Sequence, residues 1–275
     1  HARHMARFHV YNNETGGFTR HDDRKKDHSF IEAGGILVET FAWLACKTGE
    51  VWYDTLAKRV AKYCYQHHNE TTGLVENNHD GNRWDELVST TEIGLWAESM
   101  LRAAAIMKDD ELITMADNAM KAYLRYGYDE TAGKYYGQLN VADGAPATGD
   151  GYKPEKYSSV WTKRQWPHHD YPMPFAEACI DLYEQTGDEE YQAAIERWAS
   201  IVINDTPANN GDGAYAVQYG RCIHFLVRAG RLFENQTWID HAALLVDEAT
   251  GHLREGDMFK GDSDPALHQY NSVDG

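Results

Sequence analysis

Paired amphipathic segments with the period of an α-helix run through the sequence and constrain its architecture. Within residues 171–186, Phe175, Cys179 and Leu182 recur at the spacing of one helical face. The pattern predicts four helix pairs: 29–47 with 50–68, 91–107 with 110–127, 171–186 with 188–204, and 214–230 with 236–248. Polar breaks such as "KTGE" and "QTGD" separate the members of a pair, and connections this short force the two helices to run antiparallel.

A turn motif recurs in the longer connections. Its four copies are "NNETGGF" (12–18), "NETTGL" (69–74), "DETAGKYY" (129–136) and "DEATGHL" (247–253). Each copy has an acid or amide, then Thr or Ala, then Gly, and this order predicts a left-handed glycine just past a helix end. No window alternates strictly between apolar and polar residues, so a large sheet is excluded and only short strands in the loops stay open.

Repeated antiparallel hairpins predict an all-α fold, an (α/α) toroid of about four to five hairpins. We expect residues 1–275 to form a single toroid domain that lacks one or two N-terminal hairpins. In a toroid the first helix of each pair lines the centre, so the loops that lead into these helices converge on one face. An open helical solenoid that binds a partner protein is the alternative.

The composition limits the partners. A net charge of −17 argues against nucleic acid and against an anionic membrane surface, and no apolar run approaches the length of a membrane span. With 42% hydrophobic residues the chain can bury a substantial core. Its four cysteines fall in helical pattern and are expected to be buried free thiols, namely Cys46, Cys64, Cys179 and Cys222.

Two polar clusters stand immediately before predicted first helices. The first is "NNHDGNRW" (77–84), which contains Asn77, Asn78, His79, Arg83 and Trp84. The second is "WTKRQWPHHDYP" (161–172), which contains Lys163, Arg164, Trp166, His168, His169, Asp170 and Tyr171. A capped, turn-rich loop explains part of each cluster, because Asn and Asp bond their own backbone and Asp170 suits a helix N-cap. Such a loop does not explain why the clusters contain histidines, arginines and Tyr171.

The residue types in these clusters narrow the chemistry. Adjacent histidines rarely point the same way, and no HExxH or cysteine pair occurs, so we expect no metal. A glycosidase needs two carboxyl groups, and Asp80, Asp85, Glu86 and Asp170 keep that reaction open. The set of Asn, Arg, His and Tyr also suits β-elimination from a uronic acid. There Asn and Arg neutralise the carboxylate, His or Tyr takes the C5 proton, and no cofactor is required.

The first cluster resembles the Asn-Asn-His…Trp motif of α/α-toroid alginate lyases. Residues 164–191 resemble the same family's segment, in which Arg precedes Tyr by seven positions. The resemblance implies Asn78 and Arg164 on the substrate carboxylate, His79 as proton acceptor or its helper, and Tyr171 as general acid. It also implies that His169 orients the sugar or Tyr171 and that Trp84 forms a ring-stacking wall or anchors the loop. We expect the substrate-binding set to be Asn77, Arg83, Trp84, Lys163, Trp166, His168, His169, Tyr136 and Gln138.

These assignments predict a polysaccharide lyase that cleaves alginate, glucuronan or another anionic uronate polysaccharide, and a secreted or periplasmic protein. The stretch 133–160 is expected to form a lid or an altered subsite wall. Two alternatives stay open. "FAEACIDLYEQTGD" also resembles the helices of N-acylglucosamine 2-epimerases, which predicts a sugar isomerase or a glycoside hydrolase on the same scaffold. The other alternative is a non-catalytic toroid that binds glycans.

Overall fold

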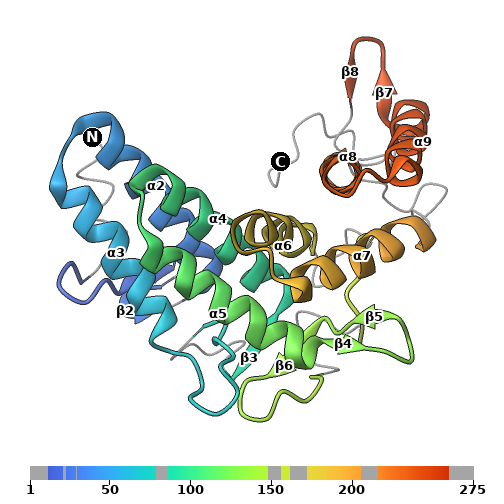
Figure 1. Cartoon of the computed structure of the whole chain (residues 1–275). Helices are drawn as coiled ribbons and strands as arrows, with labels where there is room; N and C mark the ends of the chain where they lie inside the picture. Colours follow the sequence, from blue (N-terminus) through green and yellow to red (C-terminus); the bar gives the residue numbers. More distant parts are fainter. Residues whose placement is uncertain are drawn as a thin grey trace. The chain divides into compact units, whose positions relative to one another are not determined.

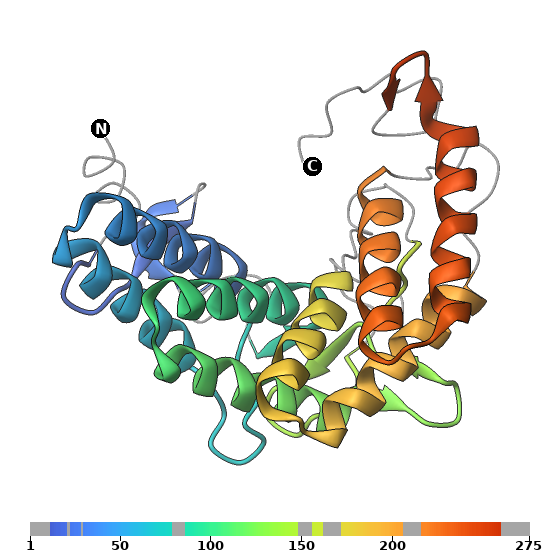
Figure 2. The ribbon, with the colours of Figure 1, turned by 45° about the horizontal axis from the view of Figure 1, so that its top comes forward.

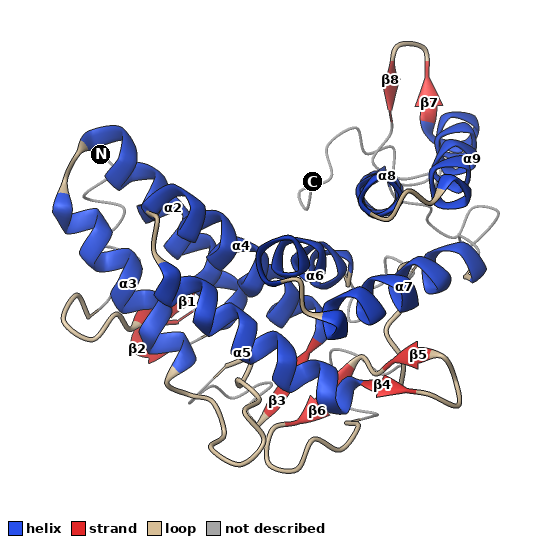
Figure 3. Cartoon of the chain, viewed as in Figure 1, coloured by secondary structure: helices blue, strands red, loops and turns tan. Residues whose placement is uncertain are grey.

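The computed structural model describes residues 12–20, 23–28, 30–78, 86–147, 156–161, 172–205 and 216–259. Within these ranges the protein has eight α-helices, joined by loops that carry strands of only two to six residues (Figures 1 and 3). The described residues fall into two compact units, and the second takes over from the first at Asp129, except that residues 138–147 belong to the first.

Unit 1 contains two antiparallel helical hairpins. They are α2 (Ile31–Thr48) with α3 (Val51–Tyr65), and α4 (Thr90–Met107) with α5 (Asp110–Gly127). The first helices of the two hairpins, α2 and α4, pack directly on each other (Figure 2). Strand β1 (Phe18–Arg20) pairs with β2 (Asp23–His28), and β3 (Leu87–Ser89) pairs antiparallel with β6 (Gln138–Asn140), just before α4 begins.

Unit 2 repeats this plan. Its hairpins are α6 (Met173–Thr186) with α7 (Glu189–Asn204), and α8 (Ala216–Leu232) with α9 (Gln236–Leu253). Here too the first helices, α6 and α8, pack on each other. Strand β4 (Tyr128–Asp129) pairs with β5 (Lys134–Tyr135), and β7 (Arg254–Glu255) pairs with β8 (Met258–Phe259). Contact between first helices is the packing expected of an (α/α) toroid, so the predicted all-α fold of antiparallel hairpins is confirmed.

The left-handed conformation is confirmed at three of the four predicted glycines, whereas the predicted position just past a helix end is wrong for all three. Gly16, Gly73 and Gly133 have φ of 91°, 78° and 64°. Each glycine donates its N–H to the carbonyl of the Asn or Asp four residues earlier, and that residue's side chain accepts two further backbone N–H groups. These turns lie within the connecting loops and do not end helices. The sequence "NVADG" hides a fourth copy, in which Gly144 has φ of 73°.

The predicted turn at 247–253 is wrong. Gly251 lies inside α9, which continues to Leu253. The helix continues through this glycine because Leu253 is fully buried and anchors the last turn.

The prediction of four buried thiols is also wrong at one position. Cys46 is exposed near the end of α2, whereas the other three cysteines are buried.

None of the helices in the described part of the chain is long and apolar enough to span a bilayer.

Glycine sets how closely α2 approaches its neighbours. A Cβ atom added at Gly35 would lie 3.0 Å from the Cα atom of Trp96 on α4. One added at Gly34 would lie 2.4 Å from Cys64 Sγ on α3. Two adjacent glycines cost a helix roughly 1 kcal/mol each relative to alanine. Close packing of α2 on α4 around the fully buried Trp96 side chain offsets that cost. The two glycines therefore stabilise the contact between helices although they weaken α2 itself.

We predict that Gly35→Ala destabilises the protein by about 1–3 kcal/mol, because the added methyl group meets backbone that cannot rotate away. Gly251→Ala is the matched control, since that position is also helical and has no atom within 4 Å of an added Cβ. The control should stabilise the protein by up to about 1 kcal/mol. Urea unfolding followed by circular dichroism measures both variants. Equal stabilisation by the two substitutions would contradict the close approach of α2 and α4.

Candidate functional site

Most of the residues predicted to form the site lie outside the described ranges. These are His79, Arg83, Trp84, Lys163, Arg164, Trp166, His168, His169 and Tyr171. Their roles stay predictions. Four of the predicted site residues are described, namely Asn77, Asn78, Tyr136 and Gln138.

Asn77 joins three segments ahead of α4. Its N–H donates to the Leu87 carbonyl, its carbonyl accepts from Ile31 N–H, and its Oδ1 accepts from Ser89 N–H at 3.0 Å. The side chain is fully buried, and the neighbouring Asn78 is only 2% exposed. The backbone contacts explain why an amide stands at position 77. Buried side chains meet a substrate only at the bottom of a site, so the predicted binding role of Asn77 stays a prediction.

Gln138 and Tyr136 lie on either side of Gly137, where the chain passes between the two units. Gln138 begins β6, is buried, and pairs with Ser89 across the β3–β6 ladder. Tyr136 belongs to unit 2 and donates its hydroxyl to Asp129 Oδ2 at 3.0 Å.

A tyrosine pair shares the Asp129 carboxylate. Tyr157 donates to the same Oδ2 atom at 2.8 Å, and the rings of Tyr136 and Tyr157 stack with centroids 5.6 Å apart. Lys156 lies over both rings, with its Nζ 3.7 Å from Asp129 Oδ2. Hydrogen bonds from Ala132 N–H and the Tyr157 hydroxyl lead the causes that lower the pKa of Asp129 to about 2. The ionised carboxylate therefore joins the 128–135 hairpin to residues 156–157.

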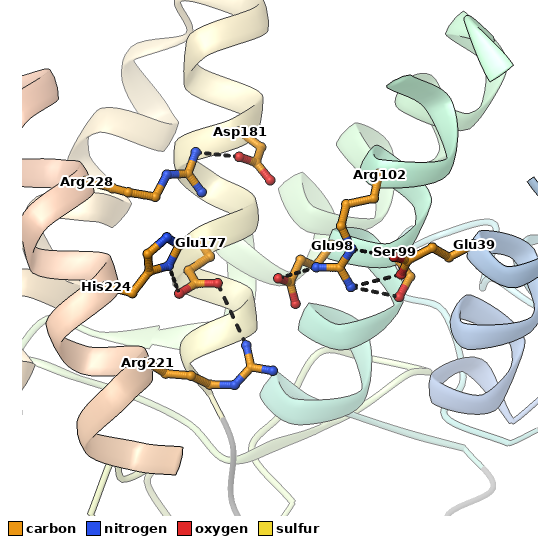
Figure 4. Close-up of polar contacts among 9 residues, drawn as sticks. All are labelled: Glu39, Glu98, Ser99, Arg102, Glu177, Asp181, Arg221, His224 and Arg228. Atoms are coloured by element: carbon orange, nitrogen blue, oxygen red, sulfur yellow. Dashed lines mark hydrogen bonds and ion pairs between the residues drawn. The ribbon is translucent and has the colours of Figure 1, made fainter. Parts of the chain in front are cut away.

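Sequence reasoning missed the polar cluster that the structure forms between α6 and α8. Acidic residues recur on α6 at 177, 181 and 184, and basic residues recur on α8 at 221, 224 and 228. This spacing places each set on one helix face, and the two faces meet where α6 packs on α8. Figure 4 shows the residues joined in pairs across the two helices.

Glu177, His224 and Arg221 form the first group. His224 Nδ1 lies 2.9 Å from Glu177 Oε1, and Arg221 Nη1 lies 3.7 Å from Glu177 Oε2 (Figure 4). The Glu177 side chain is 5% exposed, whereas that of His224 is 60% exposed. An ionised carboxylate only accepts hydrogen bonds, so this contact assigns the proton of a neutral His224 to Nδ1. Its Nε2 then carries the lone pair, on a ring that solvent and small molecules can reach.

Arg228, Asp181 and Glu184 form the second group, one helical turn further along both helices. Arg228 Nη2 donates to Asp181 Oδ1 at 2.6 Å and to Glu184 Oε2 at 3.1 Å. Within the described residues, no group of three or more His, Cys, Asp or Glu side chains is arranged to hold a metal ion. The first group offers an imidazole for proton transfer next to the positive charge of Arg221.

A sequence signal for this cluster exists. His224 and Arg221 interrupt the apolar pattern of a predicted first helix, which should present its polar side to the centre of a toroid. Glu177 likewise lies among buried residues of α6. A buried acid on one first helix predicts a basic partner on a neighbouring first helix, because an unpaired buried carboxylate is costly.

No protein-family model and no curated protein matches the chain in sequence. Solved structures do match it in fold. A cellobiose 2-epimerase from Bacillus thermoamylovorans B4167 is similar over 98% of this chain and 74% of its own, with TM-score 0.69 and 13% identity. A D-mannose isomerase matches over 94% of this chain and 73% of its own, with TM-score 0.59 and 12% identity. A GH76 α-mannanase from Bacteroides thetaiotaomicron matches over 87% and 63%, with TM-score 0.59 and 14% identity.

These likenesses confirm the fold and contradict the polysaccharide lyase prediction. The matching structures are a sugar epimerase, a sugar isomerase and a mannanase, and none of these three is a lyase. With that, alginate, glucuronan and β-elimination lose their support. The prediction failed for a physical reason. Two short polar motifs in loops do not specify a reaction, because one helical scaffold carries many chemistries.

We predict that Tyr157→Phe and Tyr136→Phe each raise the pKa of Asp129 from about 2 toward 3.8, with the larger rise for Tyr157→Phe. A carboxyl whose pKa is lowered by folding contributes stability above its unfolded pKa and loses it as pH falls through the folded value. The variants should therefore lose this contribution. Titration of the Asp129 carboxyl ¹³C signal measures the shift.

Tyr183→Phe is the control for this titration, because it removes a hydroxyl of unit 2 that bonds Gln192 instead of Asp129. An Asp129 pKa that stays at about 2 in both single variants would show that the two phenols do not hold the carboxylate.

Proposed function

We propose that this chain is a sugar isomerase or epimerase that transfers a proton at C2 of an aldose. The observation that carries the proposal is the contact between the buried Glu177 carboxylate and the exposed imidazole of His224. Sugar epimerases and isomerases among the structures of this fold support the same reaction class. A carbohydrate is then the substrate.

The chemistry begins from the open-chain aldehyde, in which the C1 carbonyl makes the C2 proton acidic. His224 Nε2 accepts that proton, and the electron pair of the C2–H bond moves toward the carbonyl oxygen to give an enediolate. Glu177 stabilises the imidazolium that forms, because its carboxylate already accepts the Nδ1 proton. Return of a proton to C2 on the opposite face re-forms the C1 carbonyl and yields the epimer. Delivery of the proton to C1 yields the ketose when the O2 hydroxyl proton also moves to O1, which turns C2–O2 into the carbonyl.

Arg221 supplies the positive charge that this step needs. Its guanidinium lies beside the same carboxylate and is 32% exposed, so a sugar oxygen can approach it. Negative charge that develops on O1 or O2 of the enediolate is stabilised by such a fixed donor more strongly than by water.

Hydrolysis fits the described residues less well. Replacement of two adjacent aspartates inactivates the α-1,6-mannanase of Salegentibacter sp. HEL1_6, a structure of similar fold. The present sequence has adjacent aspartates at 22–23 and 109–110, and Asp22 lies outside the described residues. Asp109 caps α5 by accepting from Glu111 N–H at 2.9 Å and pairs with Lys58 at 3.0 Å. Its carboxylate therefore serves the fold.

Epimerisation requires a second proton-transfer group on the other face of the enediolate. His168 and His169, which precede α6 in the sequence, have a side chain of the right chemistry for this role. Trp166 belongs to the same cluster and is a candidate to stack on the sugar ring.

The direct test is solvent exchange. Incubation with mannose or cellobiose in D₂O should remove the C2 proton signal from the ¹H NMR spectrum and produce signals of the ketose or the C2 epimer. The alternative chemistry has a different signature, because a hydrolase releases reducing ends from mannan without exchange at C2. Mannan cleavage without C2 exchange would overturn the proposal, and so would inertness toward a panel of aldoses.

Variants of the pair test the assigned roles. We predict that His224→Gln lowers kcat by about 10²-fold or more, the usual contribution of a general base. Glu177→Gln preserves the shape of the buried side chain but removes its charge, and should lower kcat comparably. His241→Gln on α9 is the matched control and should retain near-native kcat. Unchanged turnover in His224→Gln would remove this residue from the mechanism.

A further inference from the structure

We propose that Arg228 is a positioning residue that sets the register of α8 against α6 and thereby places Glu177 at His224. Its catalytic consequence rests on the proposed function, whereas its structural consequence does not. Among the described contacts Arg228 makes no hydrogen bond or ion pair with Glu177 or His224, and its direct bonds to α6 go to Asp181 and Glu184, although its charge also acts on the Glu177 carboxylate.

The contacts of Arg228 join the two helices one turn beyond the Glu177–His224 pair. Residues 177 and 181 are four positions apart on α6, and residues 224 and 228 are four positions apart on α8. Positions four apart lie one above the other on a helix. The bonds from Arg228 Nη2 to Asp181 and Glu184 therefore form a second cross-link on the same face. Arg228 is 27% exposed and Asp181 is 25% exposed, so neither is a fully solvated surface charge.

The Glu177–His224 contact tolerates little sliding. One residue of an α-helix rises about 1.5 Å along the axis. A slide of that size would stretch the 2.9 Å bond between Glu177 Oε1 and His224 Nδ1 beyond the normal range. Nδ1 would then lose the partner that assigns its proton.

Unit 1 carries the same cross-link without the acid–base pair. Arg102 donates from Nε and Nη2 to the two carboxylate oxygens of Glu39, both at 2.9 Å (Figure 4). Glu39 is the ninth residue of α2 and Asp181 the ninth of α6, while Arg102 and Arg228 are each the thirteenth residue of their helices. The cross-link is thus a device for pairing first helices, present in both units and independent of any reaction.

One turn earlier the two units differ. The positions that hold Glu177 and His224 in unit 2 correspond to Gly35 and Glu98 in unit 1. This contrast supplies a control variant, because Arg102 makes the equivalent cross-link between two helices that hold no such pair at the equivalent positions.

The test compares Arg228→Gln, Arg228→Lys and Arg102→Gln by two measurements. Long-range ¹H–¹⁵N NMR of the full chain identifies which imidazole nitrogen of His224 carries the proton. Steady-state kinetics with mannose or cellobiose separates kcat from KM. Thermal unfolding of all three variants confirms that each is folded at the temperature used.

We expect Arg228→Gln to convert the single Nδ1–H form of His224 into a mixture of tautomers. It should also lower kcat by about 10²-fold, the cost of a displacement on the order of 1 Å, while changing KM less than about twofold. Arg228→Lys should retain most of the Nδ1–H tautomer of His224 and most of kcat. An ammonium group can still join the two carboxylates, though without the planar geometry of Arg. Arg102→Gln should leave the His224 signals unchanged even if it costs similar stability.

An unchanged His224 spectrum in a folded Arg228→Gln variant would overturn the inference, and so would an equal disturbance by Arg102→Gln. The spectrum also separates this inference from the proposed function. If the native chain turns over no aldose but Arg228→Gln still scrambles the His224 tautomer, the positioning role stands and the proposed reaction fails.

Discussion

Contact between consecutive first helices is the constraint on which both units depend. In unit 1, α2 packs on α4 at a point where Gly35 admits the Trp96 backbone. In unit 2, α6 packs on α8 along a face where acidic residues meet basic ones. The second helix of each hairpin then covers the apolar side of the first. This division of labour explains why charged side chains occur among the buried residues of first helices, where an amphipathic helix of a simple bundle would carry only apolar ones.

The helices could be predicted from the sequence because their signal is local and repeated. Apolar spacing marks each segment, and polar breaks of a few residues separate partners, so the boundaries agree with the structure to within about four residues except at the end of α9. The error there is informative. Gly251 lies in a sequence motif similar to those of Gly73 and Gly133, but the buried Leu253 two positions later keeps Gly251 helical. A turn motif reports local preference, whereas the burial that overrides it depends on the tertiary fold.

The candidate site shows the opposite balance. The sequence draws attention to "NNHDGNRW" because its polar residues are consecutive, yet the described part of that loop includes Asn77, which serves the backbone around it. Glu177 and His224 are 47 positions apart, and each is unremarkable within its own helix. Only the packing of α6 on α8 brings them together. The local sequence therefore predicted a lyase, which the comparisons contradict, whereas the pairing of an acid with an imidazole across two helices becomes visible only in the structure.

Gly35 limits which residues can be exchanged between the two units. The units share a hairpin plan and a helix cross-link, and most equivalent positions could in principle hold the same residue in both. An acid at position 35, the counterpart of Glu177, would need a Cβ atom 3.0 Å from the Cα atom of Trp96. Close packing in unit 1 thus bars it from acquiring the carboxylate of unit 2 unless α2 and α4 move apart. The difference between the two units at this position is therefore fixed by backbone contact, and removing it would require the α2–α4 core to be repacked.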